Sequence, residues 1–255
     1  TNACKREIDD SIKQGGIKGP TVASYRKAID IMGVKSDVNI HLLAIPGIRE
    51  PLVTDEAARS VKDYSMSMYV MDIQHYDEDS NRLFIDSTTR SNPRETAELF
   101  ESRGVDNNYS ATYYPDVFIS DTVNNLNVKV PSSVVALGAL GYNDSVAYPW
   151  FAPAGFNRGA LSSVVNTETR LTTSDRDNLY DARINPIANF PQGGFVIFGQ
   201  KTLQQAKSAL DRVNVRRMLL EVKRLVKQIA ERLLAQKTDL VWLGISSTCQ
   251  VCVAG

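Results

Sequence analysis

Cysteine, histidine and tryptophan are scarce in this 255-residue chain, which has 3, 2 and 2 of them respectively. Three cysteines are too few for a disulfide framework, which favours a reducing compartment. An excess of one charge is also missing, because 29 Lys and Arg balance 29 Asp and Glu, so no whole-molecule attraction to nucleic acid or anionic lipid is expected. No run approaches about 20 apolar residues, so the sequence predicts no membrane insertion.

The motifs of several enzyme classes are absent as well. There is no G-x-S-x-G elbow, no G-x-x-x-x-G-K-[ST] loop and no G-x-G-x-x-G fingerprint. His41 and His75 have no second ligand at helical spacing, and Cys249 and Cys252 form a C-x-x-C with no helix after it. The sequence therefore predicts no catalytic residue, no metal site and no cofactor. An α/β enzyme of unrecognised type stays open as an alternative, and it predicts a deep pocket with convergent polar groups.

What the chain does have is an ordinary globular balance, with 43% hydrophobic and 23% charged residues. Helical and strand patterns alternate from residue 21 onward. A helix is expected over 21–32 with Thr21 as its cap, a buried strand over 38–46, a second helix from Thr54, and a strand over 66–73. This order of elements is typical of a parallel-sheet α/β unit.

Further elements follow in the second half. Pro93 and Gly104 predict the start and end of a helix within 91–104. The remaining expectations are a strand-rich stretch over 109–121, a helix over 131–142, a loop-dominated region over 143–194 with a short helix near 174–182, and a buried strand over 193–203. The predicted fold class is α/β (α+β): a mixed sheet flanked by helices, with loop-rich insertions and flexible terminal arms.

Three regions are expected along the chain: an N-terminal arm or linker over 1–20, an α/β core over 21–234, and a divergent or truncated tail over 235–255. The strongest helical pattern lies at 211–234, and its outer face is basic. Such a helix can grip phosphates, so a basic-helix nucleic-acid-binding module is a second alternative, although the helix lacks aromatic side chains that would stack on bases.

Charge is unevenly distributed between two stretches. Residues 71–125 hold eleven acids and four bases, a net of −7, and residues 201–237 hold ten bases and three acids, a net of +7. Opposite patches on a neutral chain can pair between copies. The candidate subunit-interface residues are therefore Arg212, Arg216, Arg217, Lys223 and Arg224 on one patch and Asp77, Glu78 and Asp79 on the other.

Five motifs occur in an order that is characteristic of one family. They are YSATYYPDVFISD (109–121), VPSSVVALGAL (130–140), YPWFAPAGFNRGAL (148–161), NLYDARINPIANFPQGGFVIFGQKTL (178–203) and VNVRRML (213–219). The segments LLAIPGIREPLVTDEA (42–57) and SMYVMDI (67–73) add to the pattern. Across most of 22–234 the chain resembles the contractile tail sheath proteins of long-tailed bacteriophages.

The resemblance implies a virion structural protein without catalytic residues, assembled in the host bacterial cytoplasm. Sheath subunits form hexameric rings stacked around a tail tube, and contraction drives the tube through the host envelope. The implied partners are other sheath copies, the tail tube protein, and the baseplate and tail terminator proteins, with no nucleic acid. Family members have more sequence before residue 22 and a different continuation after Leu234, so the chain is expected to be a fragment.

Overall fold

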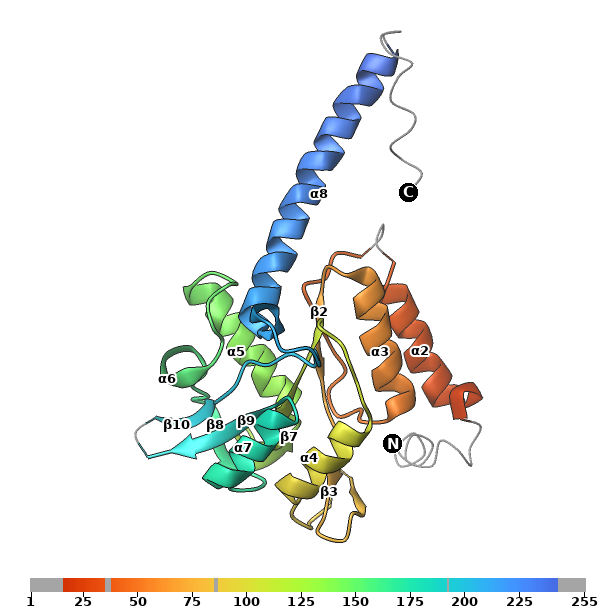
Figure 1. Ribbon diagram of the computed structural model, residues 1–255. Coiled ribbons are helices and arrows are strands. Elements are labelled where there is room, and N and C mark those ends of the chain that lie inside the picture. The colour runs from red at the N-terminus through yellow and green to blue at the C-terminus, as the bar shows by residue number, and fades with distance from the viewer. Residues whose placement is uncertain (1–15, 35–37, 85–86, 192, 243–255) are drawn as a thin grey trace.

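The computed structural model describes residues 16–34, 38–84, 87–191 and 193–242, with the backbone alone described for 235–242. Its centre is a five-stranded sheet with the strand order β1-β2-β5-β9-β10 (Figure 1). The strands are β1 (Leu42–Ala44), β2 (Met68–Met71), β5 (Ser110–Tyr114), β9 (Ile184–Phe190) and β10 (Gly194–Ile197). The first four run parallel, and β10 is antiparallel to β9.

Helices cover both faces of this sheet. One face packs against α2 (Pro20–Met32), α3 (Pro51–Tyr64), α4 (Pro93–Ser102) and α7 (Thr173–Asp181), and the other against α5 (Ser132–Val146). Neighbouring residues of β2 show the division, because Tyr69 belongs to the first core and Val70 to the second. Successive strand side chains point to opposite faces, so an almost continuous apolar run is what a strand covered on both sides needs.

A smaller three-stranded sheet adjoins the second core. Its order is β7-β6-β8, with β6 (Val117–Asp121), β7 (Leu126–Val130) and β8 (Val164–Thr167) all antiparallel. A two-stranded ribbon joins β3 (His75–Tyr76) to β4 (Arg82–Leu83), and short helical turns occur at η1 (Gly16–Lys18), α6 (Gly155–Arg158) and η2 (Ala209–Asp211).

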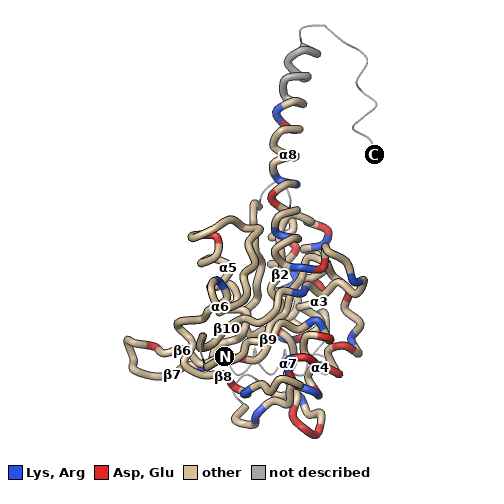
Figure 2. The backbone as a smooth tube through the Cα atoms, turned by 60° about the vertical axis from the view of Figure 1, so that its left-hand side comes forward, with Lys and Arg blue, Asp and Glu red and all other residues tan. Residues whose placement is uncertain are grey.

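Helix α8 (Val213–Trp242) begins on the body and then projects away from it (Figure 1). Val213 and Leu220 are buried in the second core. Figure 2 shows basic residues along the helix and also in the part of the body that lies at its base. None of the helices that the structure describes has the length and apolar character needed to cross a bilayer.

The predicted fold class is confirmed, and so is the parallel unit in which α3 connects β1 to β2. The predicted start of α2 is wrong in detail: Gly19 is the N-cap, and Pro20 lies at the start of the helix. The helix expected from Thr54 begins at Pro51, because a proline favours the first helical turn. Residues 75–83, for which the sequence predicts no helix or strand, form the short β3–β4 ribbon.

The largest correction concerns 184–190, which the sequence places in a loop. These residues form β9, an inner strand of the sheet. The three-part division into 1–20, 21–234 and 235–255 stays a prediction. Its outer parts fall largely on 1–15 and 243–255, which lie outside the described residues.

Candidate functional site

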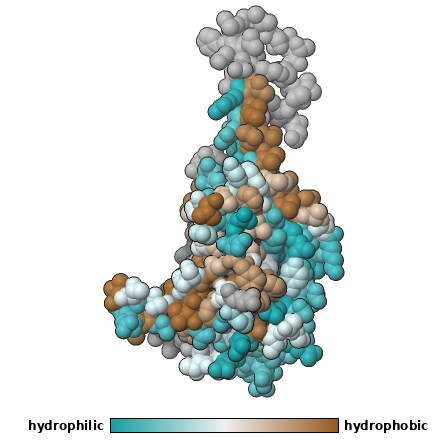
Figure 3. All heavy atoms as spheres, turned by 90° about the vertical axis from the view of Figure 1, so that its left-hand side faces the viewer, coloured by the Kyte–Doolittle hydropathy of each residue, from teal (hydrophilic) through white to brown (hydrophobic). Residues whose placement is uncertain are grey.

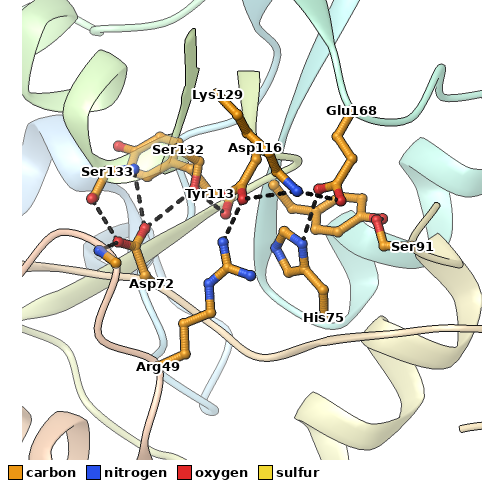
Figure 4. Close-up of polar contacts among 12 residues, drawn as sticks. Arg49, Asp72, His75, Ser91, Tyr113, Asp116, Lys129, Ser132, Ser133 and Glu168 are labelled. Carbon is orange, nitrogen blue, oxygen red and sulfur yellow. Dashed lines mark hydrogen bonds and ion pairs between the residues drawn. The ribbon is translucent and has the colours of Figure 1, made fainter. Parts of the chain in front are cut away.

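A buried group of charged side chains joins the small sheet to the rest of the protein, and we call it the ionic junction (Figure 4). Its members are Arg49, His75, Asp116, Lys129 and Glu168. Arg49 Nη2 lies 2.5 Å from Asp116 Oδ2, and Lys129 Nζ lies 2.8 Å from Glu168 Oε1. His75 Nδ1 lies 3.2 Å from Glu168 Oε2. The junction therefore links residues far apart in the sequence.

The charges in the ionic junction compensate one another. Burial by itself would raise the pKa of Glu168, but hydrogen bonds and charges from His75 and Lys129 outweigh it and hold that pKa at about 2. A carboxylate that stays ionised beside the Lys129 ammonium and the His75 ring favours the folded state. Arg49 and Asp116 make a second pair, with the two side chains 6% and 1% exposed.

His75, Asp116 and Glu168 also form a set of metal-ligand types, with donor atoms all within 4.8 Å of one another. This group could not be recognised in the sequence, because no two of its members share a helix or a short motif. Lys129 Nζ lies 2.8 Å from Glu168 and 3.9 Å from Asp116, so an ammonium occupies the position that a cation would take. The arrangement fits an internal ion-pair network better than a metal centre.

Next to the junction, Asp72 caps a helix from another part of the chain. Its carboxylate accepts hydrogen bonds from Ser133 N at 3.1 Å, Ser133 Oγ at 2.8 Å and Gly47 N at 2.9 Å. Pro131, the N-cap residue of α5, offers no side-chain bond of its own. Burial raises the pKa of Asp72, and the bonds from Gly47 and Ser133 oppose that rise. Asp72 thus satisfies backbone donors at the start of α5.

Asn185 is fully buried in β9 and holds the inner strands together. Its Nδ2 donates to the carbonyls of Thr112 and Lys201, both at 2.9 Å, and its Oδ1 accepts from Lys201 N at 2.7 Å. Sequence reasoning missed this residue, because a lone asparagine beside a proline is more typical of a turn.

The five basic interface candidates lie near the base of α8, where they contact their own chain. Arg217 Nη2 is 2.5 Å from Asp144 Oδ2 on α5, and Lys223 Nζ is 2.7 Å from Ser65 Oγ. Arg224 donates to the carbonyls of Ile40 and Met66 at 3.2 and 2.5 Å. Arg212 bonds the Tyr180 hydroxyl, and Arg216 bonds Gln204 Oε1 at 2.6 Å. These cations anchor the helix.

The acidic candidates lie in the turn between β3 and β4. Asp77 accepts from Asp79 N at 3.0 Å and Asn81 N at 2.8 Å, and the bonds from Asn81 lower its pKa. Glu78 and Asp79 are exposed. The structure does not bring these acids next to the basic residues of α8: Asp77 organises its own turn, while Glu78 and Asp79 present charge to solvent.

Surface hollows offer little of what an enzyme needs. One hollow of about 320 Å³ has Arg176, Tyr180, Phe198 and Arg212 in its wall, and another of about 430 Å³ lies between α4 and α7. Both are open, and no histidine or cysteine lines either of them. Neither of these two open hollows is the deep pocket that the enzyme alternative predicts.

The protein uses its buried charges for internal bonds, and it exposes large apolar side chains such as Val123 on the β6–β7 turn and Leu225 on α8. Residues 18–203 match the family model described as phage tail sheath protein central domain, and the chain belongs to that family. The resemblance found in the sequence is thereby confirmed.

Individual relatives agree with the family. The tail sheath protein of Vibrio phage KVP40 is 38% identical over 135 residues, which is 53% of this chain and 19% of that protein. The tail sheath protein of Enterobacteria phage T4 is 36% identical over 98 residues, or 38% of this chain and 15% of that one. The matched regions are therefore a small part of each of these relatives.

Solved structures show the same fold. The contracted helical sheath of the anti-feeding prophage matches with a TM-score of 0.56 and 22% identity, covering 84% of this chain and 52% of that one. The contracted sheath complex of the extracellular contractile injection system PVC matches with a TM-score of 0.55 and 23% identity, covering 76% and 48%. The chain thus spans about half the length of these structural neighbours.

Proposed function

We propose that this chain is the central part of a contractile tail sheath subunit. The observation that carries the proposal is the family match over residues 18–203. In this role, copies form hexameric rings that stack around a tail tube, and contraction drives the tube through the host envelope. The chain works through contacts with other copies and carries no catalytic residue or cofactor.

The surface of the protein supports this role. A polymer built by repeating one contact needs two unlike surfaces that fit each other. The β3–β4 turn offers exposed acids at Glu78 and Asp79, while the base of α8 is basic but largely engaged within the chain. The turn is the stronger of the two candidate patches, because its charges are free to meet a cationic surface on a neighbour.

The partners we propose are other sheath copies, the tail tube protein, and the baseplate and tail terminator proteins. A further structural neighbour, with a TM-score of 0.57 and 19% identity, belongs to the anti-feeding prophage baseplate. The place of action is the virion tail, after assembly in the host bacterial cytoplasm. Nucleic-acid binding is not part of the proposal, since the arginines that would grip phosphates hold α8 to the body.

An epitope tag tests the proposal directly. The turn between β6 and β7 is a suitable place for it, because Val123 is 89% exposed there. In phage particles that carry the tagged protein, immunogold label should lie along the whole tail. The labelled length should shorten when the tail contracts. Label confined to the head, or absent from intact tails, would contradict the proposal.

The nucleic-acid alternative has its own test. A gel shift at physiological salt should show no binding below high micromolar protein. Tight binding that weakens steeply with added salt would instead favour the basic-helix module.

A further inference from the structure

Helix α8 has two opposite faces that do different things. Val213, Arg217, Leu220 and Arg224 lie on the face that contacts the body, where they are buried or bonded. The residue nine positions after each of them is apolar. In the same order, these residues are Val222, Val226, Ile229 and Leu233. Nine residues are two and a half helical turns, so the second set points away from the body.

The outward face is exposed to a degree that is unusual for large apolar side chains. Val222, Val226, Ile229 and Leu233 are 50%, 59%, 49% and 58% exposed. Leu225, on the same side of the helix, is 57% exposed. Figure 3 shows the result as a hydrophobic stripe along the projecting part of α8. A stripe of this size on a free helix indicates a surface that another molecule covers.

We propose that the outward face of α8 binds the same face of a second copy of this chain, with the two helices antiparallel. The four apolar residues follow a spacing of four, three and four, which is the a and d pattern of a helix pair. In the antiparallel register, Val226 packs against Ile229 of the second copy, and Val222 packs against Leu233 of the second copy. Symmetry repeats each contact, giving four apolar layers.

Charge complementarity selects this partner and this direction. Glu221 and Arg232 lie on the same edge of the stripe, at 300° and 320° when Met218 is set to 0° and each residue adds about 100°. Antiparallel helices bring like edges together, so Glu221 faces Arg232 of the second copy twice over. The two residues differ in height by about two residues, or about 3 Å, which an arginine can span. Glu221 is 33% exposed, and its Oε1 also bonds Arg224 Nη1 of its own chain at 2.5 Å.

This contact lies outside the proposed sheath function. It is two-fold, so the same patch serves both partners, whereas a tube that grows by repetition needs contacts between unlike patches. The antiparallel helix pair therefore forms between two copies that are not yet part of a tube. There it covers the apolar stripe until lattice contacts form.

Sedimentation of the purified chain tests the pairing. The unaltered protein should sediment as a dimer at about 100 µM and dissociate on dilution. The double variant Val226→Glu/Ile229→Glu places charges in the central layers and should weaken the dimer at least about 100-fold. The control is Val123→Glu, an apolar position on the β6–β7 turn that is 89% exposed, and this change should leave the dimer intact. A monomer at every concentration, or an oligomer indifferent to the double variant, would overturn the proposal.

Crosslinking tests the direction of the helices. In a chain whose Cys4, Cys249 and Cys252 are replaced by serine, Val226→Cys and Ile229→Cys are made separately. Antiparallel pairing predicts that oxidising a mixture of the two variants yields mainly the mixed dimer. A parallel pair would crosslink each variant mainly with itself, and a different protein partner would give neither product; both outcomes would overturn the proposal. Circular dichroism of each variant confirms that the chain is folded.

Discussion

The Arg217 guanidinium on α8 lies 2.5 Å from the Asp144 carboxylate on α5, and Arg217 is only 6% exposed. This pair fixes the base of the projecting helix to the body. Arg217→Ala removes a charged hydrogen bond from a buried position, so we expect the free energy of unfolding to fall by about 2 kcal/mol. Urea denaturation followed by circular dichroism measures the loss.

Lys227→Ala is the control for that experiment. Lys227 pairs with Glu231 on the exposed part of α8 at 3.6 Å, and such surface pairs contribute little. Equal losses from the two variants would show that the Arg217–Asp144 contact has no special role.

Asn185 should be among the most sensitive polar residues. Asn185→Ala leaves the carbonyls of Thr112 and Lys201 and the Lys201 N–H without their buried partner. We expect a loss of about 3 kcal/mol in unfolding free energy, since each abandoned group costs about 1 kcal/mol or more. Thermal unfolding checks this, with the exposed Asn127→Ala on β7 as the control. A melting temperature unchanged from the parent protein would argue against the bridging role.

The ionic junction predicts a specific acid sensitivity. The folded pKa of Glu168, about 2, is below its ordinary value of 4.5. Its contribution is therefore complete above about pH 4.5 and is lost as the pH falls from there toward 2. By this linkage the contribution is up to about 3 kcal/mol.

Glu168→Gln should make the stability curve flatter over that range, as measured by urea unfolding at successive pH values. Comparing the variant with the parent protein separates the effect of Glu168 on stability from that of Asp72. The pKa of Asp72 is raised, so Asp72 changes the stability with pH in the opposite direction. Glu98→Gln is the control, because Glu98 is an exposed member of a pair with Arg94. If both variants kept the slope of the parent curve, the junction would not be the source of the acid sensitivity.

Two glycines should respond in opposite directions. A Cβ at Gly159 would lie 2.7 Å from Ala154 Cα and 2.8 Å from Gly155 N, both backbone atoms. Gly159→Ala should therefore cost about 2 kcal/mol or more. Gly141 lies inside α5 with nothing within 4 Å of the added carbon, so Gly141→Ala should stabilise the protein by about 0.5 kcal/mol. Differential scanning calorimetry measures both changes, and shifts of the same sign would contradict the explanation.

The acidic turn gives a prediction about assembly. Glu78→Lys/Asp79→Lys reverses two exposed charges and spares Asp77, which bonds its own turn. We expect an unchanged melting temperature but fewer or shorter tubes in negative-stain micrographs of the assembling sheath protein. Adding salt should narrow the difference between variant and parent. If the variant formed tubes of normal number and length at low salt, the β3–β4 turn would not be part of the subunit interface.

Local signals made several elements predictable from the sequence. The helix α4 begins at Pro93 after the cap Asn92, whose side chain accepts from Arg94 N at 3.0 Å, and Gly104 lies just beyond its end with a φ of +61°. Each of these features depends on a few adjacent residues. The alternation of helices and strands before residue 73 could be predicted from the sequence for the same reason.

Features that depend on distant partners were not predictable. Strand β9 contains Pro186, which lacks an N–H, yet its carbonyl accepts from Phe198 N at 2.8 Å and its neighbour Asn185 bonds three backbone groups. The ionic junction joins His75 to Glu168, 93 positions apart. The basic face of α8 looked free for a partner because Asp144 and the carbonyl of Met66 are remote in the sequence.

The outer side of β10 is occupied by a short stretch of the same chain. Leu161 N donates to Phe195 O, and Ile197 N donates to Gly159 O, both at 2.8 Å. An exposed edge strand can pair with a strand of another chain and so start aggregation. The stretch around Gly159 and Leu161 therefore protects the edge of β10 from pairing with other chains, and Gly159→Ala would weaken this protection.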